Sequence, residues 1–481
     1  MKVLLINPPD INMIRTNLPA VLDSEEHVGY YPPIGLLYVA AHAEKETNYK
    51  IEVLDTLVEE LDYDGIEKEI IRRQPDVVGI QTMTFTLIDV IKTARVVKKV
   101  NKNIHVCLGG PHINLYPDET IAIPEIDSLV LGEGEHAFAD LLKCLDSNSE
   151  LAKVKGIVFQ KNGKIINPGA RPMIENLDTL VHPARNLIPI EKYWSVLAKN
   201  APITTSMTSR GCPFKCIFCD RPFFGKSFRF RSAKNVVDEM EECVKVGIRE
   251  FVFYDDTFTI DRKRVYGICE EIEKRKLDVF WSVRARVAGL DEKILMTMRK
   301  AGCIRIHFGV ESGNEEILKV MKKGITLEEI RTAFKLAKKV GMTTLGYFML
   351  GNPSETREQM METIEFANTL NADYANFALT TPYPATELYQ MGFEEGIIEV
   401  DYWREFAKNP TEEFTPRFWG GEGHLAEDEL MEMLVYSYKS FYRRPRYMLN
   451  QLLQVRSWAE LKRKIKAGLL LLRNTEFKST A

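Results

Sequence analysis

The chain has 481 residues, with 64 Lys and Arg against 68 Asp and Glu and a formal net charge of −4. This length predicts two or three domains, and the balanced charge argues against general affinity for nucleic acid. The eight cysteines are irregularly spaced, which argues against a disulfide framework. The apolar start is too short for a signal peptide, and no apolar run reaches the ~18 residues of a membrane span. We therefore expect a cytoplasmic protein.

The first 147 residues alternate short apolar strands with amphipathic helices. Strands are predicted at residues 2–6, 51–55, 77–81, 105–108 and 128–131, and helices at residues 35–45, 65–73, 87–100 and 136–145. This alternation predicts a parallel, doubly wound, Rossmann-like sheet with a ligand crevice at the C-terminal ends of its strands.

Polar and glycine-rich loops follow these strands. The candidate ligand contacts in them are Asn7, Thr82, Thr84, Gly109, Gly110, His112 and Glu133. A glycine pair lets the backbone approach a ligand closely, although many such pairs are simple turns. His112 could ligate a metal or contact another part of a bound ligand. The alternative is a surface histidine that is hydrogen-bonded to water.

Residues 148–202 are predicted to connect two domains. Residues 156–166 contain the pair Asn162-Gly163 between two alternating runs, which predicts a β-hairpin. The proline-punctuated stretch that follows has no sustained period and is typical of a linker.

Three cysteines follow the linker closely: Cys212, Cys216 and Cys219. Thiolates are soft ligands that hold iron–sulfur clusters or zinc. A fully protein-ligated cluster and a structural zinc site each take four ligands. The next cysteine, Cys243, lies in a helical pattern. One metal position is therefore expected to stay open for chemistry. The alternatives from the residues alone are zinc and three buried structural cysteines.

A second strand–helix series occupies residues 203–382. Strands are predicted at residues 204–208, 250–254, 279–283, 304–310, 343–350 and 375–379, and helices at residues 233–246, 262–275, 292–300, 315–321, 327–340 and 357–370. Six units fit a partial (β/α)6 barrel, in which chemistry is found at the C-terminal ends of the strands. The polar residues at those ends include Asp256, Arg284, Arg286, Glu311, Ser312 and Gly351.

Residues 383–481 form an aromatic-rich and helical C-terminal region. A helix is predicted at residues 427–442, and a tail at residues 443–472 mixes Lys and Arg with apolar residues at helical spacing. Such a tail is either a packed basic helix or a helix that contacts a membrane surface or a lipid-like substrate.

The cysteine motif, with the aromatic Phe218 before its last cysteine, resembles the signature of the radical S-adenosylmethionine (SAM) enzymes. The resemblance implies that Cys212, Cys216 and Cys219 hold a 4Fe–4S cluster whose fourth iron binds the amino and carboxylate groups of SAM. One electron, from a donor such as flavodoxin or ferredoxin, would cleave SAM to a 5′-deoxyadenosyl radical that abstracts hydrogen.

The resemblance also implies roles at the strand ends of the barrel. Asp256 and Glu311 would accept from the SAM ammonium or ribose hydroxyls, and Arg284 or Arg286 would pair with its carboxylate. Glu311-Ser312 is the firmest match, and Gly351, expected beside adenine, belongs to the loosest. The alternative is that these residues cap helices and form surface salt bridges.

The first domain, placed ahead of this motif, resembles the cobalamin-binding domain of cobalamin-dependent radical SAM enzymes. Thr82, Thr84 and the pair Gly109-Gly110 match positions that cradle the nucleotide tail of cobalamin. Well-known cobalamin domains carry an Asp-x-His-x-x-Gly loop, but the loop at residues 9–14 has no histidine. We therefore expect cobalt without a protein ligand, unless the domain binds no corrin.

The combined resemblance implies a cobalamin-dependent radical SAM enzyme that acts on a small-molecule or lipid-like substrate. In the commonest reaction of that family, a methyl group passes to a poorly activated carbon. An oxidative cyclase, as in the anaerobic magnesium-protoporphyrin monomethyl ester cyclases, is an alternative. A sensor that binds a corrin or a metal is the non-enzymatic alternative.

Overall fold

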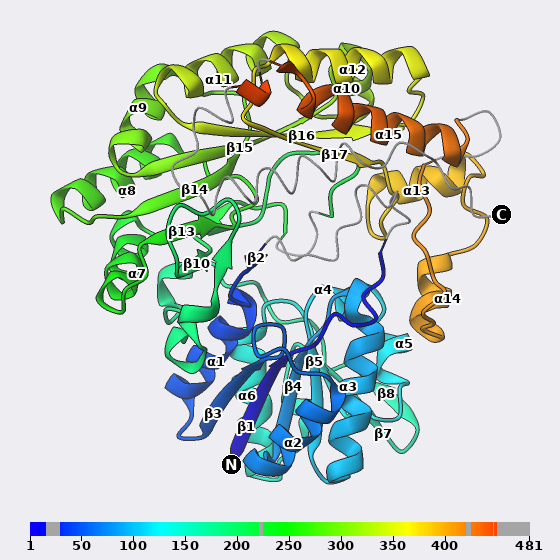
Figure 1. Ribbon diagram of the computed structural model, residues 1–481. Coiled ribbons are helices and arrows are strands. Elements are labelled where there is room, and N and C mark those ends of the chain that lie inside the picture. Colours follow the sequence, from blue (N-terminus) through cyan, green and yellow to red (C-terminus); the bar gives the residue numbers. More distant parts are fainter. Residues whose placement is uncertain (16–28, 221–224, 420–424, 446, 450–481) are drawn as a thin grey trace.

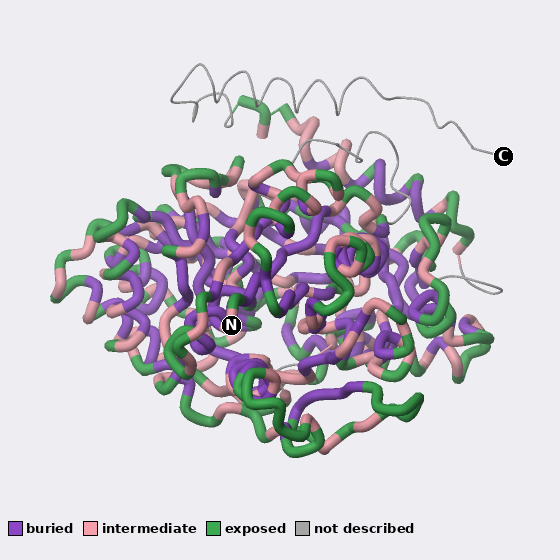
Figure 2. The backbone as a smooth tube through the Cα atoms, turned by 90° about the horizontal axis from the view of Figure 1, so that it is seen from below, coloured by how far each residue is buried: buried purple, intermediate pink, exposed green. Residues whose placement is uncertain are grey.

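Two β-sheets, each from its own part of the chain, form the frame of the molecule in the computed structural model (Figure 1). The structure describes residues 1–15, 29–220, 225–419, 425–445 and 447–449. In Figure 1 the first sheet and its helices lie below, in blue and cyan, and the second lies above, in green and yellow. Figure 2 shows buried segments throughout the interior and exposed ones mainly at the periphery.

The first sheet has seven strands. In spatial order they are β3 (Lys50–Asp55), β1 (Lys2–Asn7), β4 (Val77–Gln81), β5 (His105–Gly109), β6 (Ser128–Val130), β7 (Ile157–Lys161) and β8 (Lys164–Ile166). The first five are parallel, and β7 and β8 join as an antiparallel edge. The doubly wound sheet is as predicted, and the hairpin expected in the connector extends this sheet.

Helices cover both faces of the first sheet. They are α1 (Ile34–Glu46), α2 (Tyr63–Arg73), α3 (Leu87–Val100), α4 (Pro111–Leu115), α5 (Pro117–Ile121) and α6 (Gly134–Asp146). In β1, Val3 and Leu5 pack with α1 and α6, whereas Leu4 and Ile6 pack with α2 and α3. Because successive side chains of a strand point to opposite faces, a strand covered on both sides has an uninterrupted apolar sequence.

The second sheet is fully parallel and follows chain order. Its strands are β10 (Ile203–Ser206), β13 (Glu250–Phe253), β14 (Phe280–Ala285), β15 (Cys303–Glu311), β16 (Thr343–Leu350) and β17 (Tyr374–Leu379). Its helices are α7 (Ala233–Lys245), α8 (Arg262–Lys274), α9 (Glu292–Lys300), α10 (Glu315–Val320), α11 (Leu327–Lys339) and α12 (Arg357–Thr369). The predicted partial barrel is confirmed. Two strands end later than predicted, so that Ala285 and Glu311 still belong to β14 and β15.

Two pairs of very short strands were not predicted. β2 (Gly29–Tyr30) pairs with β9 (Trp194–Ser195), and β11 (Ser209–Arg210) pairs with β12 (Arg229–Phe230). Both are antiparallel, and β11 and β12 flank the cysteine loop.

The C-terminal region contributes α13 (Glu387–Glu394), α14 (Tyr402–Lys408) and α15 (Glu427–Tyr442). The predicted helix over residues 427–442 is confirmed as α15, which packs against β17 and α12. α14 lies beside α5 of the first domain (Figure 1). The predicted basic tail lies outside the described residues from residue 450 onward. Within the described part of the chain, none of the helices combines the length and apolarity needed to cross a membrane.

Candidate functional site

The three cysteines of the predicted motif line one cavity of about 200 Å³ at the C-terminal ends of the barrel strands. Phe218, Asp256, Arg284, Arg286 and Glu311 line the same cavity. Eight residues predicted for ligand contact are thus brought together from the cysteine loop and three strand ends. Phe214, Thr257, His307, Gly309, Lys323 and Tyr347 also line it and were not predicted.

Backbone hydrogen bonds to distant segments hold the cysteine loop in place. Ile217 N donates to Met321 O (3.2 Å), and Leu388 N donates to Ile217 O (2.9 Å). The buried Ile217 side chain packs with Leu388 and Trp419 of the C-terminal region. The loop is therefore fixed by the barrel on one side and by the C-terminal region on the other.

Asp255 fixes the segment that leads into the loop. Its carboxylate accepts from the backbone N–H and the hydroxyl of both Thr208 and Ser209 and forms an ion pair with Arg264. It is fully buried. Asp255, the neighbour of the predicted Asp256, thus binds groups of the protein itself.

A cationic side chain, Arg286, lies beside the cysteines. Arg286 Nη1 lies 3.7 Å from Cys216 Sγ, and its guanidinium stacks 3.8 Å from the Phe214 ring centroid. The guanidinium also donates to the carbonyl oxygens of Lys323 and Gly324. Although part of Cys219 is exposed to solvent, the protein around its thiol and the neighbouring cysteines raise its pKa to about 12, so the thiolate requires a positive partner.

Glu311 is held on the same side of the cavity by an ion pair. Its carboxylate lies 2.6 Å from Lys323 Nζ, and both side chains are almost buried. Glu311 has a φ of +70°, which is unfavourable for a residue with a Cβ. Gly309, two residues earlier, has no side chain because a Cβ there would overlap the Glu311 carboxylate and Lys323.

Two further predicted residues, Arg284 and Asp256, also line this cavity. The Arg284 guanidinium stacks over the Tyr254 ring at 4.5 Å. Burial and the adjacent Asp255 raise the pKa of Asp256. Nearby, His307 Nδ1 lies 3.1 Å from Tyr347 Oη. These groups give the cavity donors, acceptors and one exposed guanidinium.

Ser312 and Gly351 do not line this cavity. The Ser312 hydroxyl lies 3.1 Å from the hydroxyl of Thr363 and accepts from the backbone N–H of Asn314. A Cβ at Gly351 would lie 2.8 Å from Leu430 in α15. Contacts of Ser312 and Gly351 with a nucleoside therefore stay predictions.

The crevice of the first sheet is lined by glycines that leave space. A Cβ placed on Gly109 or Gly132 meets no atom within 4 Å. Gly110 has a φ of +127°, and a Cβ there would lie 2.5 Å from Thr82 O. Asn7, at the C-terminal end of β1, donates through its amide to Asp55 (2.7 Å).

His112 is buried beside this crevice. It is 0% exposed, so the alternative of a surface histidine is wrong. Its Nδ1 lies 3.1 Å from Thr84 Oγ1, and its Nε2 has no hydrogen-bond partner among the described residues. Burial lowers its pKa to about 4, so the ring is neutral. Thr82 is also buried, and its hydroxyl donates to Ile80 O (3.2 Å).

Glu133 faces the barrel. Its carboxylate accepts from Arg210 (2.7 Å) and Arg229 (2.8 Å) and from the backbone N–H of Ile174 (2.6 Å). Both oxygens of this carboxylate thus have hydrogen-bond partners within the protein. Its expected contact with a cofactor stays a prediction.

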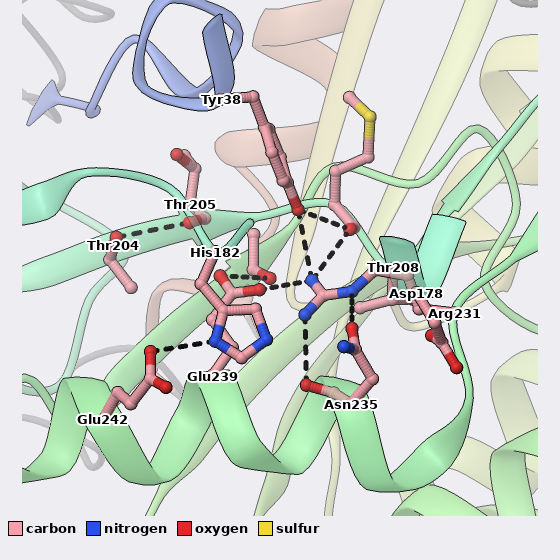
Figure 3. Close-up of polar contacts among 12 residues, drawn as sticks. Tyr38, Asp178, His182, Thr204, Thr205, Thr208, Arg231, Asn235, Glu239 and Glu242 are labelled. Carbon is pink, nitrogen blue, oxygen red and sulfur yellow. Dashed lines mark hydrogen bonds and ion pairs between the residues drawn. The ribbon is translucent and has the colours of Figure 1, made fainter. Parts of the chain in front are cut away.

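A second buried polar group also joins the first domain to the barrel. Figure 3 shows the Tyr38 hydroxyl, from α1, beside the guanidinium of Arg231, which contacts Asn235 and Glu239 of α7. Arg185 binds the same Glu239 carboxylate at 2.5 Å. Although burial by itself raises the pKa of Glu239, Arg231 and Arg185 hold it at about 2.

The residues present fit an iron–sulfur cluster, SAM and a corrin. Three thiols with cationic neighbours suit a cluster with one open iron. The guanidinium of Arg284 and the carboxylates in the same cavity suit a zwitterionic nucleoside. The open space at Gly109 and Gly132 and the unpartnered His112 Nε2 suit a polar ligand in the crevice. Among the described residues, no three His, Cys, Asp or Glu side chains are placed to bind a single metal ion.

Two family models match the chain. The Radical SAM superfamily matches residues 206–367, and the B12 binding domain matches residues 25–142. The first span includes the three cysteines, and the second includes the glycine loops of the crevice.

Curated relatives match over most of the chain. An uncharacterized methyltransferase of Pyrococcus horikoshii is 35% identical over 458 residues, which are 94% of this chain and 95% of the relative. An anaerobic magnesium-protoporphyrin IX monomethyl ester cyclase of Rubrivivax gelatinosus is 34% identical and covers 76% of this chain and 67% of the relative.

Solved structures share the fold at low sequence identity. The cobalamin-dependent SAM radical enzyme OxsB, with aqua-cobalamin and SAM bound, superposes with a TM-score of 0.73 at 17% identity, covering 98% of this chain and 72% of that one. The methyltransferase TsrM of Kitasatospora setae, with cobalamin and a 4Fe–4S cluster bound, gives 0.66 at 19% identity over 82% of this chain and 75% of that one.

Proposed function

The chain belongs to the cobalamin-dependent radical SAM enzymes, and on this premise we propose that it transfers a methyl group to a poorly activated carbon of a small-molecule substrate. The observation that carries the proposal is a full-length match to a relative described as a methyltransferase. The family's cofactors are a 4Fe–4S cluster, SAM and cobalamin. When bound, they supply one-electron cleavage of SAM, abstraction of a hydrogen atom, and a transferable methyl group.

Residues of the cavity have distinct tasks in this proposal. Cys212, Cys216 and Cys219 would hold the cluster, and Arg286 would balance its negative charge beside Cys216. Glu311 would accept hydrogen bonds from SAM while Lys323 keeps it ionised and in position. Arg284, with no carboxylate within ion-pair distance among the described residues, would bind the SAM carboxylate.

In the crevice, the glycine loops would hold cobalamin by backbone contact. Gly109 and Gly132 leave room for a ligand, and Thr84 fixes the neutral ring of His112. We propose the division of the chain into a cobalamin domain over residues 1–147, a hairpin and linker over 148–202, the barrel over 203–382 and a C-terminal region from 383 onward. The β7–β8 hairpin then completes the sheet of the first of these.

The enzyme requires an electron donor, and we propose a flavodoxin or a ferredoxin in the cytoplasm. All eight cysteines are free, which agrees with a reducing compartment. Of the three motif cysteines, Cys219 is the exposed one, so an electron would reach the cluster most directly on its side.

Oxidative cyclisation is the second candidate function, supported by the 34% identity to a cyclase. Anaerobic incubation with SAM labelled in its methyl group separates the two. Label that enters extracted metabolites of a deletion strain supports methyl transfer. Unlabelled product that has lost hydrogen, with methyl-labelled SAM consumed only as 5′-deoxyadenosine and methionine, supports cyclisation and contradicts the proposal.

A further inference from the structure

A buried group of four charged residues connects the loop of the crevice to the loop of the cysteines. We call it the interdomain ion-pair cluster, and it consists of Glu133, Glu135, Arg210 and Arg229. Arg210 donates to Glu133 (2.7 Å) and to Glu135 (2.5 Å), and Arg229 donates to Glu133 (2.8 Å). The two glutamates come from the first domain and the two arginines from the strands that flank the cysteine loop.

The cluster is shielded from water and electrically balanced. The side chains of Glu133, Glu135, Arg210 and Arg229 are 3%, 4%, 5% and 9% exposed. Burial by itself raises the pKa of Glu133, but Arg229 and Arg210 hold it below its ordinary value. The Arg210 guanidinium donates through two different nitrogens to two carboxylates. This fixes both the orientation of the guanidinium and its distance from each carboxylate, which a single ammonium group would not do.

On the side of the first domain, the cluster adjoins the open crevice. Gly132, which leaves space for a ligand, directly precedes Glu133. Its backbone N–H donates to Asn114 Oδ1 (2.7 Å), and Asn114 Nδ2 donates to Gly110 O (2.8 Å). A shift of Glu133 would therefore move two of the glycine loops that border the crevice.

On the side of the barrel, Arg210 lies two residues before Cys212. The preceding residues 208 and 209 are fixed by Asp255. Tyr38 of the first domain donates to Met207 O (3.2 Å), and the Arg210 guanidinium lies 5.3 Å from the Tyr38 ring centroid. The strand that delivers Cys212 is thus bonded to the barrel on one side and to the first domain on the other.

We propose that the interdomain ion-pair cluster is a positioning device, in which Arg210 sets the separation between cobalamin in the crevice and the iron–sulfur cluster at Cys212. This inference rests on the proposed function, because it requires both cofactors. The residues do not touch substrate; they act through the two loops they connect. Methyl transfer depends on this separation, since a misplacement of about 1 Å can slow an enzymatic step on the order of 10²-fold.

The test is the magnetic interaction between the two cofactors. Wild-type protein and an Arg210→Met variant are reconstituted anaerobically with iron, sulfide and hydroxocobalamin, and their iron and corrin contents are measured. After reduction to cob(II)alamin and the paramagnetic cluster, pulsed electron paramagnetic resonance gives the dipolar coupling between them. We expect the variant to retain both cofactors while its coupling shifts and broadens relative to the wild type.

Two conservative variants should change the dipolar coupling by smaller amounts, and they keep the test valid if Arg210→Met does not fold. Arg210→Lys reaches only one carboxylate, so its coupling should lie between those of the wild type and Arg210→Met. Glu135→Gln keeps the shape of the site and should broaden the coupling slightly. A matched control is Arg275→Met, because Arg275 likewise binds more than one carboxylate (Asp238, Glu241 and Glu271) but only on α7 and α8 of the barrel. Its coupling should equal that of the wild type.

Unchanged coupling in Arg210→Lys and Glu135→Gln would overturn the inference, also when Arg210→Met does not fold. A wild-type protein that takes up no corrin would overturn the proposed function and this inference together. A wild type with both cofactors and no response to any of these substitutions would overturn the inference alone.

Discussion

At Glu311 both the backbone and the side chain are constrained. Its φ of +70° is a conformation that costs a residue with a Cβ roughly 1–3 kcal/mol. Lys323 holds its carboxylate at 2.6 Å, and Gly309 makes room for the pair. Strain of this kind persists where surrounding contacts enforce it, and it is concentrated at functional sites.

Replacing Glu311 should weaken SAM binding. In Glu311→Ala, the lost charge-assisted hydrogen bond should cost on the order of 1.5–3 kcal/mol of binding free energy. Equilibrium binding of SAM to cluster-replete protein measures this. Glu316→Ala removes an exposed carboxylate of α10 and serves as the control. Equal SAM affinity in both variants would show that Glu311 does not contact SAM.

The cysteines differ in their expected response to substitution. Cys216→Ala should lose most of the about four irons per chain expected of a 4Fe–4S cluster. The five other cysteines are buried in strands and helices, and we expect them to be replaceable: Cys107, Cys144, Cys243, Cys269 and Cys303. Iron analysis after anaerobic reconstitution decides this, and retention of iron by a triple variant of Cys212, Cys216 and Cys219 would refute the ligand assignment.

His112 bears on how cobalt is held. Its Nδ1 is occupied by Thr84 Oγ1, and the ring is buried. Its Nε2 has no partner among the described residues and could reach a cofactor in the crevice. Because the loop at residues 9–14 has no histidine, we nevertheless predict that no protein nitrogen binds cobalt. A nitrogen ligand would split each cobalt line of cob(II)alamin into three in the electron paramagnetic resonance spectrum. A triplet that disappears in His112→Ala would show that His112 ligates the metal, contrary to this prediction.

At the scale of elements, the loop after β16 contains a buried acid. Glu355 Oε2 accepts from the backbone and side-chain nitrogens of Asn352, at 2.9 and 3.0 Å. Its Oε1 has no partner among the described residues. Burial raises its pKa to about 7. Because Asn352 also accepts from Thr380 (2.8 Å), the loop ties the ends of β16 and β17 together.

This acid should make stability depend on pH. The folded state holds the Glu355 proton more tightly than the unfolded state, so stability falls as pH rises from about 4.5 to about 7. Full ionisation at higher pH costs at most about 3 kcal/mol. Glu355→Gln should therefore raise the Tm at pH 8 and leave it nearly unchanged at pH 4.5. A Tm difference independent of pH would contradict this.

The elements themselves were largely predictable, and the reason is periodicity. Apolar runs such as residues 2–6 and helices with capping residues such as Thr326 and Glu329 carry local signals. The two-residue strands β2, β9, β11 and β12 carry none, because their pairing joins segments far apart in the chain. The pairing of β7 with β6 could not be predicted for the same reason.

The candidate site was predictable only as far as it follows the strand ends. Asp256, Arg284 and Glu311 were found in this way, and all three line the cavity. Lys323 could not be found, because it follows a short helix and reaches Glu311 from outside any strand. The role of Glu133 was also hidden, since Arg210 lies 77 residues away in the sequence.

At the scale of the whole molecule, the C-terminal region contacts both domains. Trp403 is fully buried and stacks edge-on with Phe85 of the first domain at 6.0 Å. Tyr116, beside His112, packs in the same aromatic cluster. The C-terminal region therefore packs against the first domain through Trp403 and against the cysteine loop through Leu388 and Trp419.

The bonding of Ile217 to Leu388 has a consequence for how the enzyme is made in the cell. At about 5–20 residues per second, translation reaches Leu388 on the order of ten seconds after Cys219 has been added. During that interval the three thiols stand in an unfinished loop, open to oxidation and to stray metals. We expect iron–sulfur assembly proteins to load this chain only after its C-terminal region has been synthesised and has docked. A ribosome-stalled chain that ends before Leu388 should accordingly accept little or no iron.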